Sequence, residues 1–265
     1  MKMNKLNISW WGENGNWGDA LNHILCNHLS GLEVNKIHTR TTESIFRYYC
    51  CGSILEHVQA PNFEVWGSGL IGEYGRLKVK PNKIHAVRGP LTRKLLLEQG
   101  YDCPEVYGDP ALLYPLFYRP IKIKKYQYGI IPHNMDKKSE WLLQFENNPN
   151  VKIIDILDPT GTRFVDDINQ CNVILSSSLH GIICGDSYGI PSYWIELSDK
   201  VIGKGFKFRD YYLSVGRPIV DPIRPKVGDK IKDMKFEKYS VSIDLNKLLD
   251  SCPFKKYLFT IIQTF

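Results

Sequence analysis

One pattern recurs along this chain: a short β-rich run, then a loop that contains glycine, then a segment with helical periodicity. It is clear where LNISWW is followed by GENGNWGD and ALNHILCNHLSG. It returns where KIHAVRG runs into PLTRKLLLEQG, and again where NVILSS runs into a helical segment that ends at Gly189. Strands that alternate with crossover helices are typical of parallel sheets. We therefore predict an α/β fold built from doubly wound sheets.

A break in the middle of the chain predicts two domains. The segment PLFYRPIKIKKY is rich in proline and lysine, has no helical period, and precedes a fresh strand, YGIIPH. A chain of 265 residues is long enough for two domains of ordinary size. We place the boundary near residue 122, with Rossmann-like domains over 1–121 and 122–265. In the second half we expect helices over about 137–146 and 162–170, and a helical tail at the end.

Composition narrows the class of protein. No apolar run approaches the roughly 18 residues that span a bilayer, and the start of the chain lacks a signal-peptide pattern. We expect a cytoplasmic protein. The seven cysteines are scattered without a C-x-x-C pair, so we expect reduced thiols and no metal site. The net charge of +6 favours anionic partners without choosing among phosphates, lipid headgroups and nucleic acid.

Loops that follow strands are the places where ligands bind in open α/β sheets. In GENGNWGD, closely spaced glycines allow a ligand to approach the backbone, and Asp19 is placed to cap the helix that follows. The loop is not the G-x-G-x-x-G dinucleotide fingerprint. Gly67 and Ser68, in WGSG, form another such loop or a simple turn. Arg88 lies between a strand and the helix that begins at Pro90, where a guanidinium suits a carboxylate or phosphate.

The stretch SSSLHG ends an apolar strand with three serines and a histidine. Ser176, Ser177 and Ser178 form a tight connection to a helix that starts at about Leu179, and His180 falls in its first turn. Helix N-termini attract anions, so this connection predicts an anion site. A cation is unfavourable there unless an anion is bound, and a proton that arrives with the ligand suits general acid catalysis.

Three more basic residues in the second half are candidates for the same site. His133 follows the strand YGIIP, and Lys207 and Arg209 lie in GKGFKFRDYYLSVG. Each also fits a role outside any site. His133 could be a simple loop histidine, and Lys207 and Arg209 could lie on the polar face of an amphipathic helix.

Together these segments resemble the polysaccharide pyruvyl transferase family. The matching elements, in the family's order, are NGNWGDALN, VWGSGL, AVRGPLTRKLL, YGDPALL, GIIPHNMD, SSSLHGIICGDSYGIPSYWI and KFRDYYLSVG. They cover about residues 8 to 216, and the last fifty residues fall outside the resemblance.

The resemblance implies a fold and a reaction. The fold is two Rossmann-like domains in a GT-B-like arrangement with a cleft between them. The reaction transfers pyruvate from phosphoenolpyruvate to a sugar as a cyclic ketal and releases phosphate. The acceptor would be a bacterial-type cell-surface polysaccharide or its lipid-linked precursor, and no cofactor, metal or nucleic acid is expected.

The resemblance also assigns roles to residues. His180 becomes the acid or phosphate-contacting residue, and Arg88 the arginine that binds the donor. Some relatives have arginine where this chain has Ser178, and we expect Lys207 or Arg209 to supply that charge. The first domain would bind the acceptor, and there Asp19 is the second candidate for proton transfer. The remaining candidates for substrate binding are Asn16, Gly18, Gly67, Ser68, His133, Ser177, Leu179 and Gly181.

Two other classes of function fit parts of the pattern. A GT-B glycosyltransferase that uses a nucleotide sugar would also need two doubly wound domains and a phosphate-binding helix start. A carbohydrate-binding protein could use Trp10, Trp11, Trp17 and Trp66 as sugar platforms. Finally, the basic and apolar residues from Lys255 to Ile262 suggest peripheral contact with the inner face of the cell membrane, the alternative being a terminal helix packed on the core.

Overall fold

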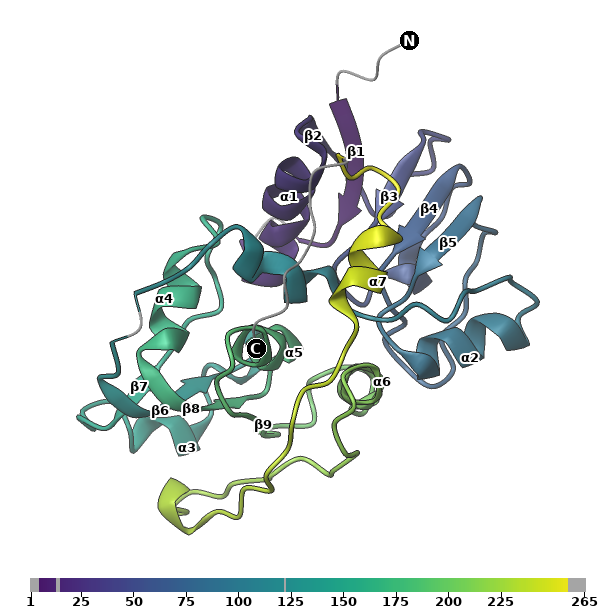
Figure 1. Cartoon of the computed structure of the whole chain (residues 1–265). Helices are drawn as coiled ribbons and strands as arrows, with labels where there is room; N and C mark the ends of the chain where they lie inside the picture. The colour runs from purple at the N-terminus through teal and green to yellow at the C-terminus, as the bar shows by residue number, and fades with distance from the viewer. Residues whose placement is uncertain (1–4, 13–14, 122, 257–265) are drawn as a thin grey trace.

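Two parallel sheets form the framework of the protein (Figure 1). The computed structural model describes residues 5–12, 15–121 and 123–256. The first sheet has the order β2-β1-β3-β4-β5, from β1 (Lys5–Trp10), β2 (Glu33–His38), β3 (Arg47–Tyr49), β4 (Phe63–Trp66) and β5 (Lys83–Ala86). The second has the order β7-β6-β8-β9, from β6 (Tyr126–Ile131), β7 (Val151–Ile153), β8 (Cys171–Ser176) and β9 (Ser192–Trp194). Every pairing between these strands is parallel, so the predicted α/β class is confirmed.

Helices and short 3₁₀ turns connect these strands. The helices are α1 (Trp17–Ser30), α2 (Pro90–Glu98), α3 (Glu140–Leu143), α4 (Arg163–Asn169), α5 (Leu179–Ser187), α6 (Phe206–Ser214) and α7 (Leu245–Asp250). The 3₁₀ turns are η1 (Leu55–His57), η2 (Pro110–Leu116), η3 (Asn134–Asp136) and η4 (Ile231–Asp233). In each sheet the chain first adds a strand on one side of its first strand and then on the other. The sheets therefore have switch points between β1 and β3 and between β6 and β8.

The start of α1 differs from the prediction. Asn16, not Asp19, caps this helix, because the Asn16 side-chain oxygen accepts a hydrogen bond from the Gly18 amide at 3.1 Å. Asp19 lies inside the first turn, where its side chain is free to face elsewhere. The other end agrees with the sequence, since Gly31 closes α1 with a left-handed φ of 64°.

The helix expected over 137–146 is also shorter than predicted. Only Glu140–Leu143 is α-helical, and the residues on either side form turns. Trp141, Leu142 and Phe145 are nevertheless buried in one cluster with Ile130 of β6 and Leu175 of β8. The apolar side chains of this segment therefore pack into the core without a continuous helix.

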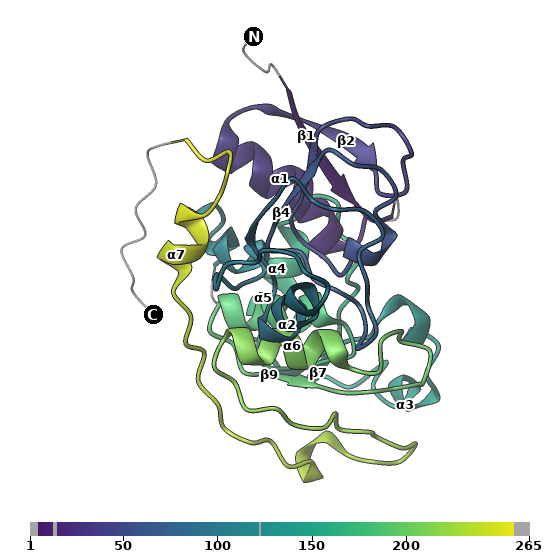
Figure 2. The same ribbon diagram turned by 90° about the vertical axis from the view of Figure 1, so that its right-hand side faces the viewer.

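The C-terminal segment joins the two sheets. After α6 the chain runs along one side of the molecule, and α7 then lies beside the first sheet (Figures 1 and 2). The Trp66 indole N–H donates to the Leu248 carbonyl at 3.0 Å, which fixes α7 to the end of β4. One continuous apolar cluster contains residues of both sheets together with α1, α5 and α7. The predicted boundary near 122 falls just before β6, but α7 packs on the half that precedes it.

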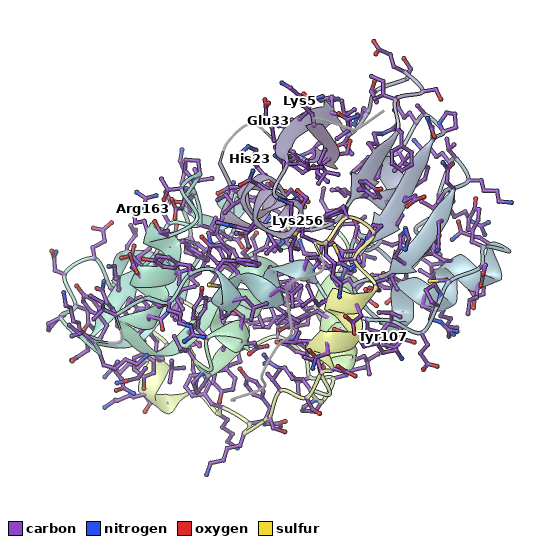
Figure 3. The ribbon with its side chains drawn as sticks, turned by 45° about the horizontal axis from the view of Figure 1, so that its top comes forward. Lys5, His23, Glu33, Tyr107, Arg163 and Lys256 are labelled. Atoms are coloured by element: carbon purple, nitrogen blue, oxygen red, sulfur yellow. The ribbon has the colours of Figure 1, made fainter. Side chains whose placement is uncertain are left out.

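Three further features of the described residues bear on predictions from the sequence. None of their helices is both long enough and apolar enough to cross a membrane. All seven cysteines are buried and unpaired, and nowhere in the described ranges do three or more metal-ligating side chains gather. Most of the segment predicted to touch a membrane, 257–262, lies outside the described residues. Lys256, labelled in Figure 3, is held against α1 because its amide donates to the Leu29 carbonyl at 3.0 Å.

Candidate active site

A cavity of about 300 Å³ lies where the switch points of the two sheets face each other. From the first half it is lined by the loops that follow β1 and β3, including Asn16 and Ser53, and by Asp19 of α1. From the second sheet it is lined by the loops that follow β6 and β8, including His133 and His180. Switch points at the carboxyl ends of strands are the usual ligand sites of such sheets. The switch points of the two sheets therefore open into a single cavity.

The three serines after β8 have three different positions. The Ser176 hydroxyl accepts from the Ser178 amide at 3.0 Å and holds the turn. The Ser177 hydroxyl donates to the buried carboxylate of Asp136 at 2.6 Å and accepts from the His133 amide at 2.8 Å, which ties the β8 loop to the β6 loop. Only Ser178, with Leu179 and His180, lines the cavity. The first amides of α5 have no acceptor within the helix, so this wall offers N–H donors to an anion.

His180 is enclosed by residues of the first half. A Cβ placed on Gly18 would lie 2.0 Å from His180 Nδ1, so only glycine permits the ring to sit against α1. On its other side His180 Nε2 lies 4.0 Å from Asp109 Oδ2. Burial lowers the pKa of His180, Asp109 raises it, and Lys207 and Arg88 lower it further. The free imidazole is therefore biased toward its neutral form.

Asp19 lines the same cavity from α1. Burial raises the pKa of its carboxyl to about 7, although Lys36 acts in the opposite direction. A carboxyl with a pKa near neutral exchanges protons readily at the pH of a cell. Asp19 and His180 therefore line one cavity from opposite sheets, the first with a raised pKa and the second with a lowered one.

Lys207 and His133 form the basic wall of the cavity. Burial, followed by Arg88, lowers the pKa of Lys207 to about 8, and Asp136 opposes the shift. Burial, followed by Lys207, lowers the pKa of His133 to about 4, so this imidazole is neutral at pH 7. Its Nδ1 accepts from the Met135 amide at 3.3 Å, which leaves the proton on Nε2. His133 is therefore a neutral hydrogen-bond donor beside a cation.

The two predicted arginines lie outside the cavity lining. Arg88 is fully buried and binds the Asp210 carboxylate at 2.8 Å, the Ser53 hydroxyl at 2.5 Å and the Leu70 carbonyl at 2.6 Å. Ser53 lines the cavity, so Arg88 is separated from the cavity by the Ser53 side chain. Arg209 binds Glu73 at 3.1 Å and the Lys204 carbonyl at 2.8 Å. Of the two cations expected to compensate for Ser178, Lys207 is the one that reaches the cavity.

Three predicted site residues serve packing in this structure. Gly67 has a φ of +94°, and a Cβ there would lie 2.3 Å from the Pro110 ring. Ser68 is buried and donates to the Gly52 carbonyl at 2.8 Å. A Cβ on Gly181 would lie 2.3 Å from the Ser176 hydroxyl, so glycine lets α5 pack directly on β8.

Sequence reasoning missed Asp109, Asp136 and two residues at the rim of the cavity, Arg40 and His57. Asp109 stands in YGDPALL, a segment that was matched to the family without a role for its aspartate, and its position after β5 could have pointed to the site. At the rim, the half-exposed Trp11 lies 4.6 Å from the Arg40 guanidinium and 4.7 Å from the His57 ring. Of the four tryptophans proposed as sugar platforms, Trp17 and Trp66 are buried and Trp11 faces the cavity.

A second cavity, of about 400 Å³, lies between β9 and the chain that leads to α7. Its polar core is Asp186, whose carboxylate already binds Arg217, Tyr211 and Tyr239. The Asp186 carboxylate is therefore fully engaged within the protein, and through Tyr239 and Arg217 this network fastens the C-terminal segment.

Comparison with known proteins identifies the family. A family model described as "Polysaccharide pyruvyl transferase" matches residues 66–199, half of the chain, and includes β8 and the start of α5. The chain belongs to the polysaccharide pyruvyl transferase family. It is also 31% identical over 211 residues to "Uncharacterized protein L143" of Acanthamoeba polyphaga mimivirus, which covers 77% of this chain and 72% of that protein. Membership in the polysaccharide pyruvyl transferase family supports transfer of a pyruvyl group as the general activity.

Proposed function

We propose that this protein transfers a pyruvyl group from phosphoenolpyruvate to a sugar and releases phosphate. The product is a pyruvate ketal on a cell-surface polysaccharide or its lipid-linked precursor, and the two sheets belong to two domains in a GT-B-like arrangement. One observation carries the proposal: a single cavity has anion-binding groups on the second sheet's side and two carboxylates, Asp19 and Asp109, on the first sheet's side.

The donor fits the wall formed by the second sheet. Phosphoenolpyruvate carries a phosphate and a carboxylate, and Lys207, the His133 Nε2–H group and the first amides of α5 offer a cation and neutral donors to them. Arg88 adds positive potential from behind Ser53. A bound trianion would also raise the pKa of His180, because it stabilises the imidazolium. The acid would thus become protonated when its substrate is in place.

The acceptor fits the wall formed by the first sheet. In our proposal one sugar hydroxyl adds to C2 of the donor while His180 gives a proton to C3, which becomes the methyl group. The C2–O bond to phosphate then breaks, and a second hydroxyl adds to the oxocarbenium carbon. Asp19 accepts the proton of one hydroxyl and passes it to the departing phosphate, and the proton of the other hydroxyl replaces the one that His180 gave to C3. The diol thus loses two protons, one to the methyl group and one to phosphate. The step as written uses no cofactor beyond the donor.

The direct test combines binding and turnover. Calorimetry should show that phosphoenolpyruvate binds, and incubation with galactose, glucose and mannosamine acceptors should release phosphate and yield a product heavier by one pyruvate ketal in mass spectrometry. Tight binding of a nucleotide sugar without binding of phosphoenolpyruvate would instead support a glycosyltransferase.

Lys207→Met should raise KM for phosphoenolpyruvate by about 10- to 100-fold, because a cation that lines the cavity and faces the donor is lost. In the native enzyme the same KM should rise above pH 8, since the pKa of Lys207 is about 8. That pH dependence should disappear in the variant. Arg209→Met is the matched control, because Arg209 lies in the same helix but binds Glu73 outside the cavity lining. Equal effects of the two substitutions would contradict the assignment.

Asp19→Asn should lower kcat by about 100-fold at pH 8 and remove the loss of rate that the native enzyme shows below pH 7. The same change should stabilise the fold at pH 8. Below pH 3.8 the carboxyl is protonated in both folded and unfolded chains; between 3.8 and about 7 it ionises more readily when unfolded, so folding stability falls and stays low above pH 7. Melting at pH 4 and pH 8, with the exposed Asp102→Asn as control, measures this difference. Stabilisation at pH 4 alone would contradict it.

A further inference from the structure

A carboxylate oxygen and an imidazole nitrogen face each other in the wall of the cavity, and neither atom has a hydrogen-bond partner. Asp109 Oδ2 and His180 Nε2 are 4.0 Å apart, and both atoms are buried and unpartnered. The Asp109 side chain is only 1% exposed. A buried polar atom without a partner is costly, and these two atoms lie within ion-pair distance of each other.

The Asp109 carboxylate is held in this orientation. Its other oxygen, Oδ1, accepts from the Ala111 amide at 3.0 Å and caps η2. The next residue, Pro110, packs against Gly67, where any side chain would collide with it. Oδ2 therefore faces His180 because the backbone around Asp109 is fixed.

His180 is fixed from the opposite side. The face of its ring, around Nδ1, Cε1 and Cγ, lies against Gly18, and the ring lies edge-on to Trp17 with centroids 6.5 Å apart. Since Nε2 is buried against Asp109, Nδ1 is the ring nitrogen left to meet a substrate. A neutral imidazole carries one proton, and a carboxylate beside Nε2 favours that proton on Nε2.

We propose that Asp109 is a positioning residue: its Oδ2 accepts the Nε2–H of His180, so that Nδ1 is the nitrogen that takes up and delivers the catalytic proton. The inference rests on the proposed function for its catalytic part. It requires the 4.0 Å gap to close by about 1 Å to normal hydrogen-bond length. His180 then gives the Nδ1 proton to C3 of the donor and keeps the Nε2 proton.

The charges around His180 show why such a partner is needed. Lys207 and Arg88 are cations that oppose protonation of the ring, and burial opposes it too. His133 is neutral, and Asp19 faces the cavity from α1. Asp109 is the carboxylate that favours the protonated ring. Without it, a general acid at His180 would depend on the charge of the bound donor alone.

Asp109→Asn tests the proposal with little change in shape. Asn Oδ1 can still cap η2, which turns the amide NH₂ toward His180 Nε2 and forces the imidazole proton onto Nδ1. We expect kcat to fall by about 100-fold or more with KM for phosphoenolpyruvate changed less than about 3-fold. The limb of the pH profile assigned to the acid should move to lower pH.

Nitrogen-15 NMR of the histidine rings gives a readout that a merely structural role would not change. Native protein should show His180 with its proton on Nε2, and Asp109→Asn should show it on Nδ1, both without substrate. Asp244→Asn is the control, because Asp244 caps α7 through the same kind of hydrogen bond away from the cavity. An unchanged tautomer would overturn the proposal. If native protein shows no pyruvyl transfer, the proposed function fails, but the tautomer still decides whether Asp109 orients His180.

Discussion

Replacing His180 with glutamine should reduce kcat for pyruvyl transfer by about 10²- to 10⁴-fold, the range expected when a general acid is lost. Glutamine keeps a polar group near Asp109 but has no proton to give at neutral pH. The side chain is enclosed by Gly18, Trp17 and Asp109, so a variant of similar volume should keep the cavity and the fold. Steady-state kinetics with phosphate release measures the loss, and thermal melting within a few degrees of native protein shows that the fold persists.

The outcome of that substitution separates a catalyst from a binding protein. A carbohydrate-binding protein would keep its sugar affinity and have no turnover to lose. His23→Gln is the control, because His23 is an exposed histidine on α1 (Figure 3). Native turnover in the His180 variant would remove His180 from the mechanism. Loss of turnover in both variants would point to a general defect.

The parts of the fold that the sequence predicts are those governed by local rules. The strand, loop and helix order follows from residues close in the chain, and so does the start of α5 at Leu179. The cap of α1 was misassigned because Asn16 and Asp19 are both good capping residues. Only the packing of Trp17, whose indole donates to the Gly161 carbonyl at 2.9 Å, fixes where the helix begins.

The parts that the sequence does not predict depend on contacts between distant residues. Arg88 looked free to bind a ligand, but its partner Asp210 lies 122 positions later. Asp109 can be recognised as a site residue only from the fold, which brings it to His180 of the other half. In the same way α7 returns to Trp66, 182 positions away, because its apolar side completes the core of the first sheet. No local pattern encodes these pairs.

Gly18→Ala should abolish most turnover without unfolding the protein. The added methyl carbon would lie 2.0 Å from His180 Nδ1, far inside van der Waals contact, so the imidazole must move. Gly18 is inside a helix, where alanine is favoured over glycine, and the substitution places no strain on the backbone. We expect kcat to fall by about 100-fold or more, because a misplaced catalytic group loses its geometry. Melting should stay within a few degrees of native protein.

Gly72→Ala provides the matched control for that result. A Cβ at Gly72 would meet only the Gly203 α-carbon, at 3.9 Å, so the same chemical change has room there. Its turnover should equal that of native protein. A chemical shift of the His180 ring nitrogens in Gly18→Ala, absent from Gly72→Ala, would show directly that the ring has moved. If Gly18→Ala instead shifted the ring and kept full activity, the position of His180 against α1 would not matter for proton transfer, and the pairing of Nδ1 with the substrate would be wrong.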